Sequence, residues 1–351
     1  MNVDLLVNAI KLHDNLNPLQ FSGNFYYTID YVKALLEKDN FKLKVLVDQF
    51  TFEYVKEFAE SEQIERVQLN TKSKFQEIIS ADRHVMKAES EFQPKVYHRP
   101  TGQLPFKKLQ CKTLSTIHDL NFKYLPTNPI QKLYKEISYK WTLNRADRIV
   151  AISDYTADEL EKYYGNKNIT TIKNPLRRFQ EINEENSKYG EGFLFTFAQH
   201  PHKNPKLVID SYERLLKADI NMCNLLIIGD NSYIESEVKP YAKSKACKER
   251  IIFTGRISDE ELINIYKNAK LMLFLSSYEG FGMPVIEALS FGCPVLSSDI
   301  RPLTDFENKG LFFTSYQDIS EVSSKLKKLV SNEDLRNIVQ ADKIKKEYSM
   351  D

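Results

Sequence analysis

The sequence predicts an α/β fold of two doubly wound domains, and three observations lead to this prediction. Strand-like and helix-like hydrophobic patterns alternate from the first residues onward, which is typical of a parallel sheet covered by helices. A length of 351 residues exceeds what one ordinary hydrophobic core holds. A polar, turn-rich span at residues 183–192 separates two such alternating series. We therefore expect a first domain at 1–175, a linker at 176–190 and a second domain at 191–351.

Composition and charge narrow the class of protein. The net charge is +1 and hydrophobic residues make up 42% of the chain, which argues against a general affinity for nucleic acid. No apolar run approaches the length of a membrane span, and the first residues do not resemble a signal peptide. The four cysteines form no C-x-x-C pair and are expected to be reduced. These features predict a cytoplasmic protein.

The first half is expected to form strands at 3–9, 41–47, 66–69, 95–98, 112–117, 147–152 and 170–173. Gly23 lies in the loop after the first strand, before a helix expected at 26–36. This loop opens at the carboxyl ends of the strands, where such folds bind ligands. No G-x-G-x-x-G motif occurs there, so the nicotinamide or flavin fingerprint is absent. His118 follows strand 112–117, and from the residues alone a ligand contact and a structural hydrogen bond remain equally open.

The most informative stretch of the second half is LMLFLSSYEGFGMPVIEALSFGCPVLSSD, residues 271–299. A continuous apolar run predicts a buried parallel strand at 271–275. Gly280 and Gly282 allow a tight turn, and Pro284 suits the first turn of the helix that follows. Further strands are expected at 193–198, 225–228, 250–254 and 310–313, with helices at 259–268 and 319–330. The pattern predicts strand, glycine turn, helix, turn and strand.

Two carboxylates flank this turn, Glu279 before it and Glu287 inside the helix. A helix N-terminus presents unpaired N–H groups, so the backbone from Phe281 to Met283 is able to hold a pyrophosphate without a metal. Glu287 is then placed to accept hydrogen bonds from ribose hydroxyls, and Glu279 from a sugar. The alternative is that both are ordinary solvated carboxylates. The first interpretation suits a nucleotide sugar.

The segment EGFGMPVIE, from Glu279 to Glu287, resembles the signature of a known family: a Glu, seven residues and a second Glu, with glycines after the first. The family is the retaining nucleotide-sugar glycosyltransferases of the GT-B fold, glycosyl transferases group 1 or family 4. The resemblance implies two Rossmann-like domains facing a cleft. It also implies a donor bound mainly by residues 193–299, an acceptor on the first domain and transfer with retention of anomeric configuration.

Other segments resemble the same family. TIHDLNFKYLP matches its HDL segment, which implies that His118 faces the donor sugar, and Gly23 matches a glycine that approaches the donor phosphates. In AQHPHKNP, Lys203 matches the second residue of a basic pair and His202 replaces an arginine, while the loop after Gly255 implies a contact with the base. The resemblance thus implies catalytic roles for His118, Glu279 and Lys203. The implied donor-binding residues are Gly23, His202, Lys203, Gly255, Arg256, Glu279, Gly280, Phe281, Gly282, Met283 and Glu287.

No D-x-D triplet occurs in the chain, so we expect a metal-free site in which a helix N-terminus and Lys203 stabilise the departing diphosphate, with no cofactor. The predicted reaction moves a hexose-type sugar from a nucleoside-diphosphate sugar to a saccharide or lipid-linked saccharide acceptor in surface polysaccharide synthesis. Two alternatives stay open. One is a sugar-nucleotide epimerase or hydrolase on the same fold, and the other is a non-catalytic sugar-nucleotide-binding protein.

The stretch 104–148 has a lopsided charge and many aromatic residues. Its cations are Lys107, Lys108, Lys112, Lys123, Lys132, Lys135, Lys140, Arg145 and Arg148, and its acids are Asp119, Glu136 and Asp147. Trp141 lies within a helix expected at 129–144. One interpretation is a peripheral contact with an anionic membrane at its inner face, or with a phosphate-bearing acceptor. The other is a solvated helix face with a packed tryptophan.

Overall fold

The computed structural model describes residues 3–10, 23–38, 41–57, 62–69, 73–165, 168–179, 187–217 and 223–349. The chain divides into two compact units, one up to Arg177 and one from Arg178 onward. The boundary falls in the predicted linker, of which residues 180–186 lie outside the described residues. The loop at 11–22, between the first strand and Gly23, also lies outside them.

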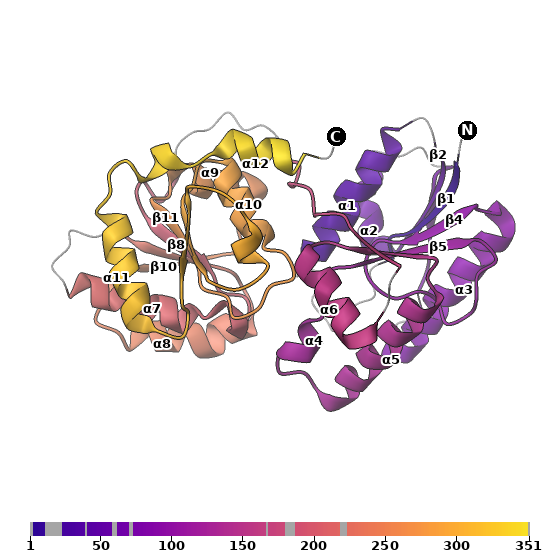
Figure 1. Cartoon of the computed structure of the whole chain (residues 1–351), viewed down its shortest axis with the longest axis horizontal. Helices are drawn as coiled ribbons and strands as arrows, with labels where there is room; N and C mark the ends of the chain where they lie inside the picture. Colours follow the sequence, from indigo (N-terminus) through magenta and orange to yellow (C-terminus); the bar gives the residue numbers. More distant parts are fainter. Residues whose placement is uncertain are drawn as a thin grey trace. The chain divides into compact units, whose positions relative to one another are not determined.

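Unit 1 contains a parallel sheet in the order β3-β2-β1-β4-β5-β6-β7. Its strands are β1 (Val3–Asn8), β2 (Phe41–Val47), β3 (Ile64–Arg66), β4 (Val96–Arg99), β5 (Lys112–Ile117), β6 (Arg148–Ala151) and β7 (Ile169–Thr171). Its helices are α1 (Gly23–Leu36), α2 (Gln49–Val55), α3 (Lys74–Phe92), α4 (Asn121–Tyr124), α5 (Pro129–Arg145) and α6 (Asp154–Tyr164). Successive residues of β1 enter different cores: Leu5 and Val7 pack with α1 and α2, whereas Leu6 packs with α3 and α6. Helices therefore cover both faces of the sheet (Figure 1).

The third strand lies earlier than predicted. β3 pairs with β2 from Val45 opposite Ile64 to Val47 opposite Arg66, and Val67 N–H donates to the Val47 carbonyl 2.8 Å away. β2 ends at Val47, so residues beyond Val67 have no strand beside them in this sheet. The prediction of a strand at 66–69 is therefore wrong in position, because the partner strand sets the limit and apolar pattern alone does not show it.

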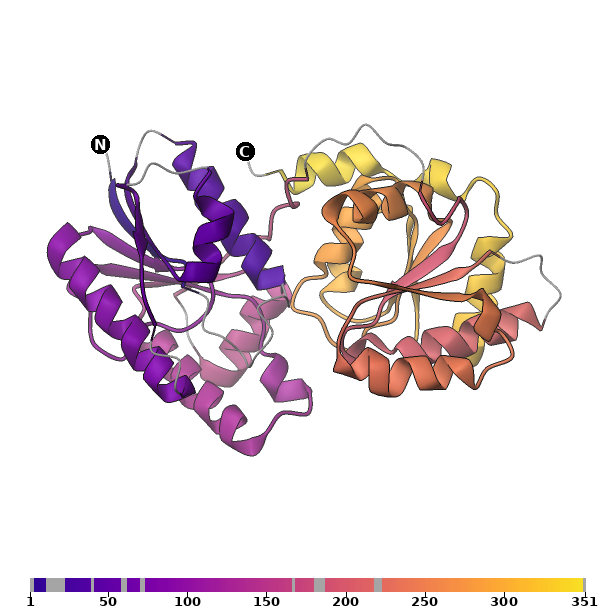
Figure 2. The same cartoon turned by 180° about the vertical axis from the view of Figure 1, so that it is seen from behind.

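Unit 2 contains a second parallel sheet in the order β10-β9-β8-β11-β12-β13. Its strands are β8 (Leu194–Phe197), β9 (Leu225–Ile228), β10 (Ile251–Gly255), β11 (Leu271–Phe274), β12 (Val295–Ser298) and β13 (Leu311–Thr314). Its α-helices are α7 (Pro205–Leu216), α8 (Lys239–Lys243), α9 (Asp259–Asn268), α10 (Met283–Ser290), α11 (Ile319–Val330) and α12 (Ala341–Glu347). Within this unit, α7, α8 and α11 cover one face of the sheet, and α9, α10 and α12 cover the other (Figures 1 and 2).

Both sheets have the doubly wound order in which the chain first builds outward in one direction and then in the other. The reversal lies between β1 and β4 in unit 1 and between β8 and β11 in unit 2. Loops that leave neighbouring strands in opposite directions open a crevice at their carboxyl ends, where open α/β sheets bind ligands. The predicted fold class is confirmed, and the topology indicates where each unit binds its ligand.

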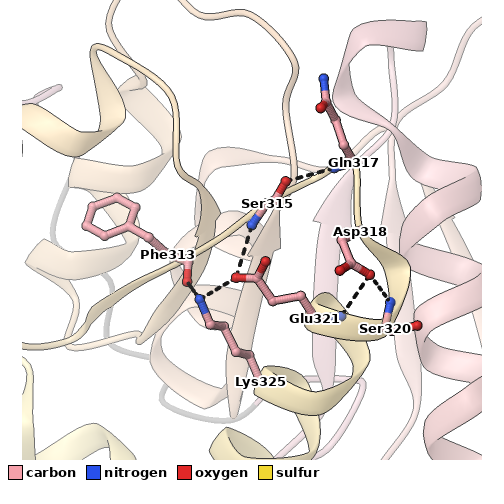
Figure 3. A network of polar contacts seen from close by, with 7 residues as sticks. All are labelled: Phe313, Ser315, Gln317, Asp318, Ser320, Glu321 and Lys325. Carbon is pink, nitrogen blue, oxygen red and sulfur yellow. Dashed lines mark hydrogen bonds and ion pairs between the residues drawn. The ribbon is translucent and has the colours of Figure 1, made fainter.

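Local contacts fix the elements around the second sheet. At the start of α11, Asp318 accepts hydrogen bonds from Ser320 N–H at 2.8 Å and Glu321 N–H at 3.2 Å. Lys325 Nζ donates to Glu321 Oε1 and to the Phe313 carbonyl, both at 2.6 Å (Figure 3). The helix is thereby capped and attached to the carboxyl end of β13.

Candidate functional site

Two loops of unit 2 meet at the point where its sheet reverses. One leaves β8 and contains His202, and the other leaves β11 and contains Ser277. Ser277 N–H donates to the His202 carbonyl 2.8 Å away, and Asn204 Nδ2 donates to the Leu275 carbonyl at 2.7 Å. These hydrogen bonds hold the loops against each other independently of any ligand.

Lys203 lies before α7 and not within it. It ends a short 3₁₀ turn, Pro201–Lys203, and Asn204 follows with φ +51° before α7 begins at Pro205. A residue before proline disfavours the helical region, and asparagine tolerates the left-handed one. The break leaves the Lys203 side chain outside the regular turns of α7, on the loop that leaves β8.

Lys203 forms an ion pair with Glu279 across this reversal point. Their side chains are 13% and 12% exposed, and Lys203 Nζ lies 4.4 Å from the centroid of the Phe274 ring. Charges largely removed from water interact more strongly, and burying them is costly unless they are paired. An ammonium group has three donors, so Lys203 is able to keep Glu279 and also bind an anionic ligand. The structure thus brings together two of the three predicted catalytic residues.

The N-terminus of α10 lies directly after Glu279 in the chain. Gly282 is the N-cap with φ +108°, and an added Cβ would lie 2.5 Å from Leu303 Cδ2. Only glycine tolerates both the positive φ and the lack of space for a Cβ. Glycine also provides no side chain to cap the first N–H groups of the helix. The neighbouring Phe281 side chain is buried against Phe306 at a ring distance of 5.3 Å. Phe281 therefore anchors the turn through its ring, which leaves its backbone for a ligand.

Glu287 is buried inside α10 rather than solvated. The Tyr266 hydroxyl of α9 donates to Glu287 Oε2 at 2.8 Å, and the Tyr266 ring stacks on Phe291 with centroids 5.8 Å apart. Arg336 donates to carbonyls at the ends of α9 and α10, those of Ala269 and Phe291. The sequence analysis did not identify Tyr266 or Arg336. A tyrosine among apolar residues of α9 looks like an ordinary core residue, and no motif marks Arg336.

His202 lies beside Lys203 but does not supply a second charge. Burial, together with the neighbouring Lys203 cation, lowers the pKa of His202 to about 4. Its ring stacks on that of His200 with centroids 5.3 Å apart and an interplanar angle of 11°. At neutral pH the histidine that replaces the family's arginine is uncharged, so Lys203 alone provides the positive charge of this loop.

Gly255 and Arg256 lie further along the sheet. Gly255 ends β10 with φ +68°, and β10 is separated from β8 by β9. Arg256 is exposed. The sheet order therefore places these two predicted base contacts at the far edge from β11, while Glu279, Gly280, Gly282, Met283 and Glu287 gather around the start of α10.

In unit 1, His118 lies just beyond β5 and is buried. One ring nitrogen, Nε2, lies 2.9 Å from the Pro100 carbonyl, and the ring meets the edge of Tyr27 at 4.7 Å. A carbonyl only accepts, so Nε2 carries the proton and Nδ1 has a lone pair. Burial lowers the pKa of His118 to about 4, and the imidazole is neutral at physiological pH. Within the described residues Nδ1 has no hydrogen-bond partner, so it is able to accept one from a hydroxyl group.

Arg99 occupies the reversal point of unit 1 and was not among the predicted site residues. Its buried guanidinium donates through Nη1 to the Asn8 carbonyl at 3.0 Å, Asn8 Oδ1 at 2.7 Å and the Ile10 carbonyl at 3.0 Å. These bonds direct its Nη1 group to the chain at the carboxyl end of β1. Gly23, at the other end of that loop, is exposed and has nothing within 4 Å of an added Cβ, so its predicted phosphate contact stays a prediction.

Two family models match consecutive parts of the chain. The model described as Glycosyltransferase Family 4 matches residues 26–177, and Glycosyl transferases group 1 matches 178–346. This chain belongs to the group 1 glycosyltransferases. The matches meet at the boundary between the two compact units of this glycosyltransferase.

Curated relatives of the glycosyltransferase include two proteins named for O-antigen synthesis. O-antigen chain mannosyltransferase RfbU of Salmonella typhimurium is 28% identical over 236 residues, which cover 64% of this chain and 65% of the relative. O-antigen chain mannosyltransferase B of Escherichia coli is 24% identical over 268 residues, covering 72% and 69%. For the first of these, the match therefore spans slightly less than two thirds of the relative's length.

Solved structures share the fold over nearly the whole chain. Sucrose-phosphate synthase from Thermosynechococcus elongatus has a TM-score of 0.71 at 17% identity, covering 98% of this chain and 97% of that one. WaaG, a glycosyltransferase involved in lipopolysaccharide biosynthesis, has a TM-score of 0.70 at 12% identity, covering 99% and 95%. Identities this low show the GT-B fold alone.

The described residues of this glycosyltransferase contain neither a membrane-spanning helix nor a metal-binding cluster. No helix among them is long and apolar enough to cross a bilayer. No group of three or more His, Cys, Asp or Glu residues among them is arranged to hold a metal ion.

Proposed function

We propose that the protein transfers a hexose-type sugar, with mannose the first candidate, from a nucleoside-diphosphate sugar to a saccharide or lipid-linked saccharide of a surface polysaccharide. The Lys203–Glu279 ion pair carries this proposal, because it stands at the reversal point of the second sheet beside the start of α10. The names of the O-antigen relatives support mannose and the polysaccharide.

Lys203 and the N-terminus of α10 bind the diphosphate in this proposal. A diphosphate gains negative charge as its bond to the anomeric carbon breaks, and preorganised donors stabilise that charge. The acceptor hydroxyl oxygen forms the new bond to the anomeric carbon on the same face, and its proton passes to the departing phosphate oxygen. Atoms and charges balance without a metal or cofactor, and the configuration is retained.

The carboxylates orient the donor. Glu279, held by Lys203, accepts hydrogen bonds from hydroxyls of the transferred sugar. Glu287, held by the Tyr266 hydroxyl, accepts them from the ribose. His118 contributes its neutral Nδ1 as an acceptor for a sugar hydroxyl. These assignments keep the roles implied by the resemblance and add the groups that hold each side chain in place.

A peripheral contact with an anionic membrane completes the proposal. A lipid-linked saccharide presents its sugar at a membrane surface, so an enzyme that uses it gains from residing there. The excess of cations in residues 104–148 supports this contact.

Calorimetric titration with GDP-mannose, UDP-glucose, UDP-galactose and UDP-N-acetylglucosamine, each with and without EDTA, tests the donor site. We expect one of them to bind equally well in EDTA. Lys203→Met and Glu287→Gln should each weaken that binding about 10- to 100-fold, because each removes a charged hydrogen bond worth about 1.5–3 kcal/mol.

Lys206→Met is the matched control, since Lys206 lies three residues further along, inside α7, and its partner is the exposed Glu237 at 2.9 Å. Its affinity should equal that of the wild type. Unchanged affinity in both site variants would overturn the placement of the donor. Release of free sugar at the same rate with and without acceptor would indicate a hydrolase instead of a transferase.

A further inference from the structure

Helix α5 carries large apolar residues on its solvent face. Ile130, Leu133, Ile137 and Trp141 are 79%, 61%, 55% and 39% exposed, and their spacing of three and four residues places them on one side of the helix. We call these four residues the α5 stripe. The buried residues of the same helix are Ser138, Thr142 and Leu143. A helix on a soluble protein normally shows the opposite arrangement, with its apolar side chains turned toward the core.

The C-terminal end of the stripe is ordered by contacts with a neighbouring loop. The Trp141 ring lies 6.2 Å from that of Phe106, which is itself 41% exposed. The Arg145 guanidinium lies 4.6 Å over the Trp141 ring and donates to the Phe106 carbonyl at 2.8 Å. The apolar surface therefore continues from the helix onto residue 106 and ends at a cation.

Two of the three acids of this region are paired with neighbouring lysines. Glu136 pairs with Lys123, and Asp147 pairs with Lys112 at 2.8 Å. Lys107, Lys108 and Lys140 are exposed and form no ion pair within the described residues. This face of unit 1 consequently presents an apolar stripe with unneutralised positive charge beside it.

Arg145, which lies over the Trp141 ring, also lines a cavity of about 830 Å³. Its charged lining residues are Lys95, Lys107, Lys108, Lys112, Arg145 and Asp147. With Asp147 occupied by Lys112, the cavity is basic and open to anions. Lys135, which the sequence analysis placed among the cations of this region, belongs to another side of α5: it is half-buried, with Nζ 3.3 Å from Asn121 Oδ1.

We propose that the α5 stripe inserts into the interfacial layer of an anionic lipid bilayer, with Lys107, Lys108, Lys140 and Arg145 at the lipid phosphates. This inference rests on the proposed function for its membrane contact and identifies the surface that makes it. Charge complementarity favours lipid over a second copy of this chain, because two copies would bring a positive face against a positive face. An anionic bilayer instead offers its acyl chains to the stripe and its phosphates to the cations. The helix lies in the plane of the membrane and does not cross it.

Trp141 is the only tryptophan of the chain, so its fluorescence reports on the stripe directly. The probe is vesicles of phosphatidylglycerol and phosphatidylethanolamine, compared with pure phosphatidylcholine. On the anionic vesicles we expect co-sedimentation, a shift of Trp141 emission to shorter wavelength and quenching by brominated acyl chains. The triple variant Ile130→Gln, Leu133→Gln, Ile137→Gln should bind at least about ten-fold more weakly, because three apolar side chains no longer leave water.

Glutamine is a good helix former, so α5 should persist in this variant. The matched control is Ile172→Gln with Ile338→Gln, two isoleucines that are 57% and 37% exposed outside α5, and it should bind like the wild type. Lys107→Gln, Lys108→Gln, Lys140→Gln should abolish the preference for anionic over neutral vesicles and the sensitivity of binding to salt.

Wild-type protein that stays in the supernatant with anionic vesicles at low salt would overturn the inference. So would a concentration-dependent dimer that the stripe variant abolishes, since the stripe would then be an interface between two copies. Sugar-nucleotide affinity measured without vesicles should be the same in all these variants. A wild-type protein that binds the anionic vesicles but none of the four sugar nucleotides would refute the proposed function and still support the membrane-binding surface.

Discussion

The reversal points of the two sheets have the same topology and different chemistry. In unit 2 the loops after β8 and β11 present a lysine and a glutamate as an ion pair, next to an uncapped helix N-terminus. In unit 1 the corresponding cation, Arg99, donates through Nη1 to Asn8 and to the Ile10 carbonyl, and the nearby His98 and His118 are neutral at physiological pH. The first arrangement suits an anionic ligand such as a diphosphate, and the second suits a ligand recognised through hydroxyl groups.

This difference shows how one topology serves two kinds of ligand. The sheet order determines where a crevice opens, and the few residues directly after the central strands determine which charge it accepts. Unit 2 keeps the Lys203 ammonium beside an uncapped helix N-terminus, whereas the Arg99 guanidinium of unit 1 donates to carbonyls at and just beyond the end of β1.

Acidification should produce the largest effect and should act on unit 1. Burial lowers the pKa of His98 to about 3 and that of His118 to about 4, from about 6.5 in an unfolded chain. Between pH 6.5 and the lowered pKa values, the two histidines bind protons in the unfolded state but not in the folded state. The free energy of unfolding therefore falls as pH falls. From pH 7 to pH 5 each histidine should lower the free energy of unfolding by about 2 kcal/mol, and the two together by about 4 kcal/mol.

Urea unfolding followed by Trp141 fluorescence measures this slope, because Trp141 belongs to unit 1. His98→Gln should reduce the pH dependence of the free energy of unfolding between pH 5 and 6.5 by the equivalent of about one bound proton. A wild-type stability that does not change over this range would mean that the two histidines are not buried as neutral groups.

Gly282→Ala should produce the next largest effect and should act on unit 2. Its φ of +108° disfavours any side chain, and the new methyl group would collide with Leu303. We expect a loss of about 3 kcal/mol in the free energy of unfolding, measured in urea, together with weaker donor binding. Gly190→Ala shares the positive φ without the collision and should lose only about 1–2 kcal/mol.

The corresponding glycine of unit 1 sharpens the comparison. Gly23 also begins a helix, but it has open space around an added Cβ and does not adopt a positive φ. Gly23→Ala should leave stability within about 0.5 kcal/mol of the wild type. Equal losses in Gly23→Ala and Gly282→Ala would show that the start of α10 is no more constrained than that of α1.

Local sequence patterns predicted the elements well where one strand or helix carries its own signal. The strands 41–47, 112–117 and 225–228 and the helix 259–268 have the predicted bounds, and Gly282 turns as its position between β11 and α10 indicated. The strand expected at 66–69 was misplaced because its limits depend on β2, a partner far along the chain.

The candidate site was predictable as a set of residues and not as a set of contacts. Spacing placed Glu279 near a helix N-terminus, but the pairing with Lys203 depends on β8 and β11 being neighbours, which only the sheet order reveals. Tyr266 and Arg336 act on the site through other groups, so no motif marks them. The α5 stripe was not predictable from the sequence, because the burial of Ser138 and Thr142, which turns the apolar residues outward, is a tertiary property.

His118→Ala is expected to act on turnover rather than on donor affinity, and it separates the two units most directly. His118 belongs to unit 1 and the residues proposed to bind the diphosphate belong to unit 2, so affinity for the nucleoside diphosphate should stay at the wild-type value. Turnover should fall about 10- to 100-fold, the effect of losing one hydrogen bond in the transition state. Calorimetry and initial rates at saturating donor measure the two quantities.

His118→Asn is the conservative comparison, because an amide is able both to donate to the Pro100 carbonyl and to accept from a hydroxyl. It should recover part of the lost turnover, and a purely structural role would instead change stability and leave turnover per folded molecule constant. Because the pKa of His118 is held near 4, the part of the rate that depends on it should not change between pH 6 and 8. A rate that rises through pH 6.5 in the wild type and not in His118→Asn would show that His118 titrates as an exposed base, and the hydroxyl-binding character assigned to unit 1 would then be wrong.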